Sequence, residues 1–359
     1  MPVATTDFDQ NLPLERASAL PAPWYTSPEI YQQEISRIFH DSWLMVGTQH
    51  QFANVGSYQS LEIAGEPIAL IQQDTGEITA QSNVCRHRAA VLLPSSHGEC
   101  SRIRCPYHGW TYDLQGNLRG TPEFEGVQDF SKESCRLPQF QLTTTPPWLW
   151  LHLGTPQVSA DEVLAPFLQW WNELPIQHLQ HHRQVEYIIE CNWKIFIDNY
   201  LDGGYHVHAV HPALADVLDY SQYRTDLHPW CNVQSSPLKP GDAANPASTT
   251  RAGGTAYYWW LWPNVMVNYY PGILDTNTVY PLGVDRCRVV FDYYFSPEHS
   301  DDFREQSIGV AHQIQLEDLE ICESVQRGLQ SRHYHAGRYS AKREAGAHHF
   351  HRLMAQALQ

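Results

Sequence analysis

The chain has few basic residues: 23 Lys and Arg stand against 39 Asp and Glu, for a net charge of -16. An acidic protein repels phosphate backbones and anionic lipids, so we expect no nucleic acid and no membrane partner. Long apolar runs are also lacking: the stretch from Ala256 to Val267 is too short to span a bilayer and contains Pro263. Met1 to Leu20 lacks the basic and apolar regions of a signal peptide. These absences predict a soluble, cytoplasmic protein.

Charged residues make up only 17% of the 359 residues, whereas 42% are apolar and 12% are aromatic. This composition excludes a disordered chain, and the length allows two domains of roughly 100–200 residues each. Only 8 cysteines are present, and without a secretion signal they need not form disulfides. Cysteines that stand close to some of the 20 histidines are better explained as metal ligands.

Apolar patterning divides the chain into an N-terminal segment and two domains. In the segment, residues 1–42, Ser27-Pro28 suits the N-cap and first position of a helix that ends near His40. Residues 43–153 contain short alternating runs with glycine-rich breaks, which predict a small antiparallel β domain. Residues 154–359 mix strand-like and helix-like stretches, which predict an α+β domain.

Several elements of the third part are predicted individually. They are a strand over Gln184–Glu190, a helix over Trp193–Leu201, a strand-like aromatic run over Tyr257–Tyr270, a strand over Arg288–Phe295 and a long helix over Asp301–Gln330. Residues 234–254 hold several prolines and glycines, and we expect a long loop there, either a lid or a mobile surface segment.

Two short stretches each combine one cysteine with one histidine. Cys85 and His87 form the first pair, Cys105 and His108 form the second, and seventeen residues separate His87 from Cys105. Two Cys and two His suit either a structural zinc ion or an iron–sulfur cluster in which the cysteines hold one iron and the histidines the other. Zinc sites usually draw both cysteines from one stretch and both histidines from another. The mixed stretches therefore favour two adjacent irons.

These four residues and the run Pro106–Trp110 resemble the two-stretch motif of the Rieske family. The resemblance implies that Cys85, His87, Cys105 and His108 hold a [2Fe-2S] cluster. Two imidazoles in place of two thiolates raise the reduction potential to about -150 to +300 mV, from about -400 mV in plant-type ferredoxins. Such a cluster can accept electrons from a ferredoxin or a flavin. The other cysteines have no ligand-like spacing, and we expect them to pack in the core.

A second group of ligand-type side chains lies in residues 198–211, which contain two acids and three histidines. His206 and His211 are five residues apart, and the preceding pair Gly203-Gly204 allows the backbone to bend toward one metal. Two imidazoles lack one carboxylate of a 2-His-1-carboxylate facial triad, so a third ligand must come from elsewhere. His208 lies between the two and is an alternative ligand.

The long helix can supply that carboxylate. Its apolar stripe is expected to consist of Phe303, Val310, Ile314, Ile321, Val325 and Leu329. Asp318 falls on the stripe, four residues after Ile314, and a buried carboxylate needs a metal or another partner to stay charged. Glu317 and Glu320 are alternative ligands, and a slightly rotated helix would leave Asp318 in solvent.

A Rieske motif followed by an Asp-rich His-x4-His resembles the large (alpha) subunit of Rieske non-haem iron oxygenases. In that family an Asp five residues before a Glu is the third iron ligand, and Asp318 and Glu323 match this pattern. The resemblance implies a Rieske domain followed by a helix-grip (START-like) catalytic domain with an antiparallel sheet, on which the N-terminal segment packs. It also implies mononuclear Fe(II) at His206, His211 and Asp318.

Within this family, parts of the chain resemble the choline monooxygenases. These parts are Asn192–Lys194, Asp198–Val207, Asp275–Asn277, Val289–Tyr293 and Cys322–Leu329. The likeness implies a monooxygenase that uses O2 to hydroxylate a small quaternary or methylated ammonium compound, such as choline, betaine or carnitine. The alternative is the alpha subunit of an aromatic-ring-hydroxylating dioxygenase, with the same metals and a neutral apolar pocket. The second ligand set argues against a simple electron carrier.

The resemblance also implies an electron route. A separate flavin- or ferredoxin-type reductase reduces the cluster, and electrons then cross to the iron of a neighbouring subunit through a bridging acid. A ring of subunits is therefore expected, most often a homotrimer. The family commonly places the acid three residues before the first ligand histidine, where this chain has Gly203. Asp202 is the best bridging residue here, and Asp198 is the alternative.

A quaternary ammonium group has no hydrogen to donate, so aromatic faces must recognise it. Alternation along a strand places Tyr257 and Trp259 on one face and Tyr258 on the other, so half of the rings belong to the core. We predict that Tyr257, Trp259 and Tyr269 line the substrate pocket.

Overall fold

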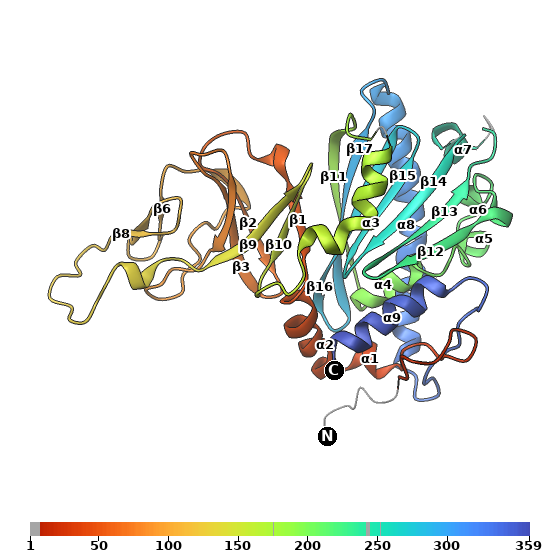
Figure 1. Ribbon diagram of the computed structural model, residues 1–359, viewed down its shortest axis with the longest axis horizontal. Helices are drawn as coiled ribbons and strands as arrows, with labels where there is room; N and C mark the ends of the chain where they lie inside the picture. The colour runs from red at the N-terminus through yellow and green to blue at the C-terminus, as the bar shows by residue number, and fades with distance from the viewer. Residues whose placement is uncertain (1–7, 175, 242–244, 252) are drawn as a thin grey trace. The chain divides into compact units, whose positions relative to one another are not determined.

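The computed structural model describes residues 8–174, 176–241, 245–251 and 253–359 (Figure 1). The chain forms two compact units: Phe39–Ala160 makes the smaller one, and Met1–Ile38 joins Asp161–Gln359 in the larger one. Within the described ranges, no helix combines the length and the apolar character needed to cross a membrane.

The smaller unit consists of antiparallel sheets, as the sequence predicted. Its strands are β1 (Leu44–Thr48), β2 (Ser57–Ile63), β3 (Glu66–Gln72), β4 (Ile78–Ser82), β5 (His97–Glu99), β6 (Ile103–Arg104), β7 (Thr111–Tyr112), β8 (Leu118–Gly120), β9 (Gln139–Thr145) and β10 (Trp148–His152). One sheet has the order β1-β10-β9-β4-β3-β2-β5, and β6-β7-β8 form a smaller sheet. Because β1 pairs with β10, the chain enters and leaves this unit along neighbouring strands.

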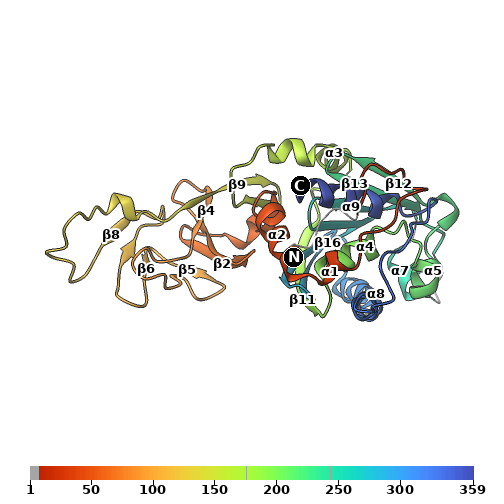
Figure 2. The same cartoon turned by 90° about the horizontal axis from the view of Figure 1, so that it is seen from below.

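The larger unit contains one antiparallel sheet in the order β11-β17-β16-β15-β14-β13-β12. Its strands are β11 (Gln180–Ile189), β12 (Arg224–His228), β13 (Cys231–Pro237), β14 (Thr255–Leu261), β15 (Val265–Tyr270), β16 (Ile273–Gly283) and β17 (Arg286–Phe295). The helices are α1 (Pro23–Thr26), α2 (Pro28–Glu34), α3 (Ala160–Glu173), α4 (Trp193–Tyr200), α5 (Val207–Val210), α6 (Pro212–Ala215), α7 (Pro246–Thr250), α8 (Asp301–Leu329) and α9 (Ala345–Ala357). Figure 2 shows α3 and α8 on opposite faces of the sheet. This helix-grip arrangement confirms the α+β prediction.

The N-terminal segment begins its helix where the sequence predicted. The Ser27 hydroxyl accepts the backbone N–H groups of Glu29 and Ile30, and Pro28 is the first residue of α2. This segment packs within the larger unit: Glu34 and Lys194 are both fully buried and form an ion pair of 2.5 Å. A buried carboxylate and a buried ammonium are each stable only beside a group of opposite charge, and here they supply this for each other.

The aromatic run forms the hairpin of β14 and β15, because the turn at Trp262-Pro263 interrupts the ladder. Tyr257 stands opposite Tyr269, and Tyr258 stands opposite Asn268. Since neighbouring residues of a strand face opposite sides, the first pair points to the α3 face and the second to the α8 face.

Two expectations about local structure need correction. The predicted loop over residues 234–254 includes the last residues of β13 and helix α7, while residues 242–244 and 252 lie outside the described residues. Gln234 belongs to the sheet because its amide donates to the carbonyl of Tyr200 (2.8 Å). The prolines and glycines that predicted a loop lie at and just after the end of β13, at the first position of α7 and just before β14, where these residues are tolerated.

The predicted stripe of α8 is also partly wrong. Ile321 and Val325 are 36% and 43% exposed, whereas the buried side chains include Gln315, Cys322 and Gln326. Polar residues occupy the inner face because they find partners there: Gln326 accepts the backbone N–H of Asn192 at 2.7 Å. The helix is therefore rotated relative to its apolar pattern.

Candidate functional site

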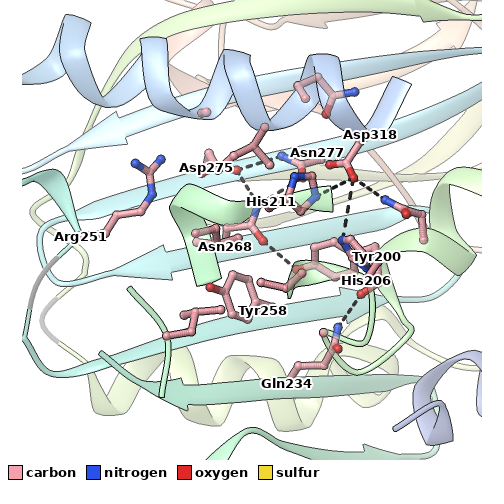
Figure 3. A pocket seen from close by; sticks show the side chains of 18 of the residues that line it. Tyr200, His206, His211, Gln234, Arg251, Tyr258, Asn268, Asp275, Asn277 and Asp318 are labelled. Carbon is pink, nitrogen blue, oxygen red and sulfur yellow. Dashed lines mark hydrogen bonds and ion pairs between the residues drawn. The ribbon is translucent and has the colours of Figure 1, made fainter. Parts of the chain in front are cut away.

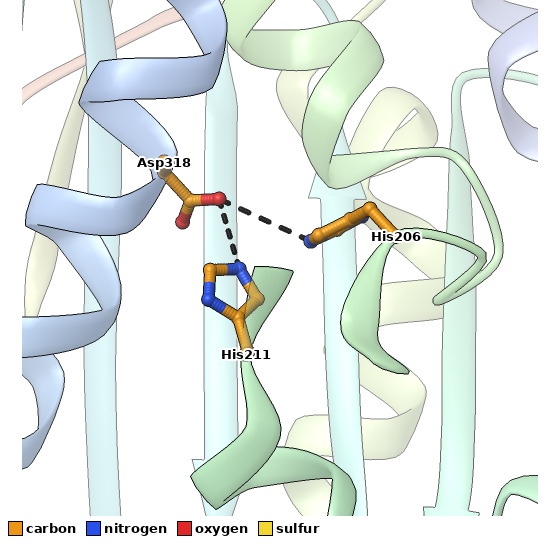
Figure 4. A group of neighbouring side chains, drawn as sticks. All are labelled: His206, His211 and Asp318. Atoms are coloured by element: carbon orange, nitrogen blue, oxygen red, sulfur yellow. Dashed lines mark hydrogen bonds and ion pairs between the residues drawn. The ribbon is translucent and has the colours of Figure 1, made fainter. Parts of the chain in front are cut away.

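His206, His211 and Asp318 converge beside the sheet (Figure 4). Asp318 Oδ1 lies 3.0 Å from His211 Nε2 and 3.9 Å from His206 Nε2, and one ligand atom of each residue lies within 4.8 Å of the others. Ligands at right angles around an octahedral ion, at about 2.1 Å from it, are about 3 Å apart. The geometry therefore fits one metal ion with three protein ligands on one side.

Two short helices and a glycine turn place the histidines. Gly203 and Gly204 have φ of 71° and 70°, and a Cβ on Gly203 would approach the Arg343 carbonyl oxygen within 2.1 Å. His206 follows this turn at the N-cap of α5, and His211 is the N-cap of α6. Both imidazoles face Asp318 of α8.

Each imidazole is held by a second carboxylate. His206 donates Nδ1–H to Asp202 Oδ2 (2.7 Å), and His211 donates Nδ1–H to Glu317 Oε2 (2.6 Å). These bonds leave both Nε2 atoms free to face Asp318, as in metal sites whose outer carboxylates fix the ring orientation. Burial opposes the charged form of His211, but Asp318 and Glu317 outweigh it and raise its pKa.

The alternative ligands lie elsewhere. Glu317 holds His211 through Nδ1 on the side away from Asp318, and Glu320 is exposed. The exposed His208 packs against Tyr220, with ring centroids 4.6 Å apart. Neither Glu320 nor His208 belongs to the group of three side chains that can share one ion.

The two Cys-His stretches of the smaller unit have the same backbone conformation. In each loop the backbone N–H of the cysteine donates to the backbone carbonyl of the fifth residue after it. The backbone carbonyl of the cysteine accepts from the N–H of the fourth residue after it, and all four distances are 2.8–3.1 Å. The fourth residue after the cysteine has a positive φ in both, 54° at Ala89 and 74° at Gly109. These matching loops present Cys85 and Cys105 as an equivalent pair.

The four side chains of these loops form a pair of thiols and a pair of imidazoles. Cys85 and Cys105 are both 3% exposed, and burial raises the pKa of Cys85, with a further contribution from Cys105. The rings of His87 and His108 are 4.6 Å apart. His87 Nδ1 is buried and has no hydrogen-bond partner among the residues the structure describes. A metal ligand needs such a free nitrogen, and this pairing fits two irons better than one zinc.

A cavity extends from His206, His211 and Asp318 between α8 and the sheet (Figure 3). The empty space in it, open mouth included, is ≈ 820 Å³. The aromatic side chains that line it are Phe196, Tyr200, Tyr223, Tyr258, Tyr270 and Phe291. Aromatic surface thus surrounds the space next to His206, His211 and Asp318.

The prediction for the pocket residues is wrong. Tyr257, Trp259 and Tyr269 pack instead against Trp170 of α3, with ring centroids 5.5, 5.5 and 5.7 Å from that ring. Tyr257 and Tyr258 do face opposite sides of the sheet, as predicted, but the side of Tyr258 is the one that faces the cavity.

Sequence reasoning missed two charged residues of this cavity. Asp275 is 4% exposed, and this burial raises its pKa. Its Oδ2 accepts hydrogen bonds from the side-chain amides of Asn268 (2.7 Å) and Asn277 (2.9 Å). Arg251 is 3% exposed and lines the same cavity. The unbroken polar run Asp275–Thr278 along a buried strand was the available signal.

Comparison with known proteins matches both parts of the chain to known domain families. Residues 42–131 match the family described as Rieske [2Fe-2S] domain, and residues 176–359 match the ring hydroxylating alpha subunit, catalytic domain. The chloroplastic choline monooxygenase of Arabidopsis thaliana is 36% identical over 372 residues, covering 99% of this chain and 86% of that protein. A solved structure of a quaternary ammonium Rieske monooxygenase is 25% identical, with a TM-score of 0.89, over 99% of this chain and 100% of that one. That protein was studied for carnitine oxidation by gut microbiota and for inter-subunit electron transfer.

Aromatic dioxygenases are more distant. Naphthalene 1,2-dioxygenase from Rhodococcus sp. is 19% identical with a TM-score of 0.77, covering 95% of this chain and 94% of that one, and this likeness shows the fold alone. The matched domains imply a [2Fe-2S] cluster and a mononuclear iron. The chain belongs to the Rieske oxygenases, as an alpha subunit with a Rieske domain and a ring-hydroxylating-type catalytic domain.

Proposed function

We propose that this protein is the oxygenase component of a monooxygenase that hydroxylates a methylated or quaternary ammonium compound. The observation that carries the proposal is the buried carboxylate of Asp275 in an aromatic cavity next to His206, His211 and Asp318. Buried charges require a partner of opposite sign, and a bound ammonium group supplies one. The identity to choline monooxygenase supports this substrate class.

The cavity recognises the cation through rings and charge. Tyr223 and Tyr258 stack in near-parallel planes, with centroids 6.3 Å apart, and the hydroxyls of Tyr258 and Tyr270 lie 3.0 Å apart. Each ring that faces the cation contributes about 0.5–2 kcal/mol, more when water is excluded. Asp275 adds an attraction that a neutral arene cannot use, which argues against the aromatic dioxygenase alternative.

The metal ligands are part of the same proposal. The cluster is held by Cys85, Cys105, His87 and His108, and the mononuclear iron by His206, His211 and Asp318. When bound, that iron supplies O2 activation for insertion of oxygen into a C–H bond, and a facial triad leaves positions open for this. Asp202 and Glu317 keep the two imidazoles oriented, and Asn199 donates to Asp318 Oδ1 at 2.6 Å.

We further propose that Asp202 bridges the metal centres of neighbouring subunits in a homotrimer. Its side chain is 15% exposed and bonds directly to His206. An exposed tyrosine stands beside each metal-binding stretch, Tyr205 next to His206 and Tyr107 next to His108, both 60% exposed. Large exposed rings at these places suit surfaces that another subunit covers. A flavin- or ferredoxin-type reductase supplies the electrons.

Product analysis tests the proposal. The iron-loaded protein, a reductase and O2 are incubated with methylated ammonium compounds and with flat arenes. We expect hydroxylation or N-demethylation of an ammonium compound. Hydroxylation of arenes with no reaction of any ammonium compound would refute the proposed substrate class.

A further inference from the structure

The buried guanidinium of Arg251 forms no direct ion pair among the residues that the structure describes. Arg251 is 3% exposed. The hydroxyl of the adjacent Thr250 accepts from its Nη1 at 3.1 Å, and the carbonyl of Ser307 accepts from its Nη2 at 3.5 Å. Nε is buried and has no hydrogen-bond partner within the described ranges. Asp275 is close enough to Arg251 to interact with it electrostatically, but its hydrogen bonds come from Asn268 and Asn277. A buried cation with only neutral partners is costly unless an anion joins it.

Gln315 is a second unpaired donor of the same cavity. It is 2% exposed, lies on α8, and its Nε2 is buried without a hydrogen-bond partner among the described residues. Arg251 and Gln315 thus both offer N–H groups that lack an acceptor. A carboxylate accepts several hydrogen bonds at once and matches the planar guanidinium.

Arg251 lies at the end of the cavity away from the metal-binding side chains. Figure 3 shows Arg251 on one side, His206 and Asp318 on the other, and Asp275 between them. Ser307, which contacts Arg251, precedes Asp318 by eleven residues of α8, which is about 16 Å along a helix axis. A ligand that contacts both ends must therefore be elongated.

The ring next to Arg251 also favours this orientation. The guanidinium lies over Tyr270, 4.9 Å from the ring centroid. Because the guanidinium already covers the face of Tyr270, a second cation is repelled from the Arg251 end of the cavity. The ammonium group therefore belongs at the end with His206, His211 and Asp318, the residues that would hold the iron.

We propose that Arg251 and Gln315 bind a carboxylate, so that the substrate is a betaine-type zwitterion. Its methylated ammonium lies toward His206, His211 and Asp318, and its carboxylate lies at Arg251. This inference rests on the proposed function, and it narrows the substrate from any ammonium compound to those with a carboxylate at the far end. Choline carries only a hydroxyl there and leaves the guanidinium without an anion.

Calorimetry on the anaerobic, metal-loaded protein tests the inference with γ-butyrobetaine, glycine betaine and choline as probes. We expect the carboxylates to bind more tightly than choline. Arg251→Gln should reduce the preference for γ-butyrobetaine over choline by about 10- to 100-fold, because a charge-assisted double hydrogen bond is lost. Gln315→Leu should reduce the same preference by a smaller factor.

Arg288→Gln is the matched control. Arg288 also lies over a tyrosine, 5.1 Å from the ring centroid of Tyr280, but it does not line the cavity. This variant should leave the preference unchanged. A comparison that needs no variant uses the unmodified protein with γ-butyrobetaine and its methyl ester, and the ester should bind at least about 10-fold more weakly.

The outcomes separate this inference from the proposed function. If choline or the ester binds as well as γ-butyrobetaine, or if Arg251→Gln weakens all probes equally, the carboxylate site is refuted while the ammonium substrate class stands. If no ammonium compound binds or reacts, the proposed function itself is refuted.

Discussion

Asp202 accepts two hydrogen bonds from His206, one from the ring Nδ1 at 2.7 Å and one from the backbone N–H at 2.9 Å. The carboxylate thereby fixes both the imidazole and the start of α5. It also forms a direct link from the protein surface to a proposed ligand of the mononuclear iron. A structural role and a role in electron transfer predict different results when the charge is removed.

Asp202→Asn tests the bridging role. We expect both metals to stay bound and the cluster to remain reducible, while oxidation of the reduced cluster in a single turnover slows by about 10- to 100-fold. Asp198→Asn is the control, because Asp198 bonds to His351 (2.7 Å) and Tyr25 (2.6 Å) and not to His206. An unchanged rate in Asp202→Asn together with a slow rate in Asp198→Asn would move the bridge to Asp198.

Substitutions of the proposed ligands should separate colour from activity. Cys85→Ala removes a cluster ligand and should abolish the brown-red colour. His206→Ala leaves the cluster intact, so the visible spectrum should persist while turnover is lost. Iron analysis of the unmodified protein should give about three irons per chain, two in the cluster and one mononuclear. Full activity in His206→Ala, or zinc in place of iron in anaerobically prepared protein, would show that the sites are assigned wrongly.

The cavity should bind ammonium compounds less well in acid. Burial raises the pKa of Asp275 above its ordinary 3.8, so its carboxylate takes up a proton at a higher pH than an exposed Asp does. Affinity should be full above the pKa of Asp275 and should fall as the pH drops through it. Asp275→Asn should bind weakly at every pH and lose this pH dependence. The measurement is calorimetry across a pH series, and an unaltered pH profile in the variant would exclude Asp275 as the counter-ion.

Neighbouring tyrosines of β14 provide a matched pair for the pocket. Tyr258→Leu should raise KM for an ammonium substrate by about 2- to 30-fold, the range of one cation–π contact. Tyr257→Leu removes a ring that packs on α3 and should lower the melting temperature with little effect on KM. A raised KM in Tyr257→Leu with an unchanged KM in Tyr258→Leu would mean that the face of β14 with Tyr257 lines the pocket.

Local patterns predicted much of the fold. The N-cap at Ser27, helix α4 and the long helix α8 follow from spacing and capping residues that lie next to each other in the chain. The two Cys-His stretches were also recognisable, because each loop carries its own pair of ligand-type side chains. His206 and His211 lie on one short segment, so their proximity followed from the sequence.

Features that depend on distant packing were not predictable in the same way. The sequence showed that Tyr257 and Tyr258 face opposite sides, but not that α3 covers the side of Tyr257. Arg251 stood in an expected loop, and only the fold brings it to the cavity that also holds Asp275. The apolar pattern of α8 pointed to Ile321, which is exposed. In each case a tertiary contact decided which of two faces is buried.

The most direct test of the account compares ammonium substrates with carbon isosteres of the same shape. Coupling of O2 uptake to product is measured for γ-butyrobetaine against 5,5-dimethylhexanoate and for choline against 3,3-dimethylbutanol, with the metal-loaded protein and a reductase. Because ring faces and the Asp275 carboxylate act on positive charge, coupling should be high for an ammonium compound and low for its neutral-headed partner. Equal coupled turnover of the isosteres would contradict the claim that this oxygenase selects a methylated ammonium group.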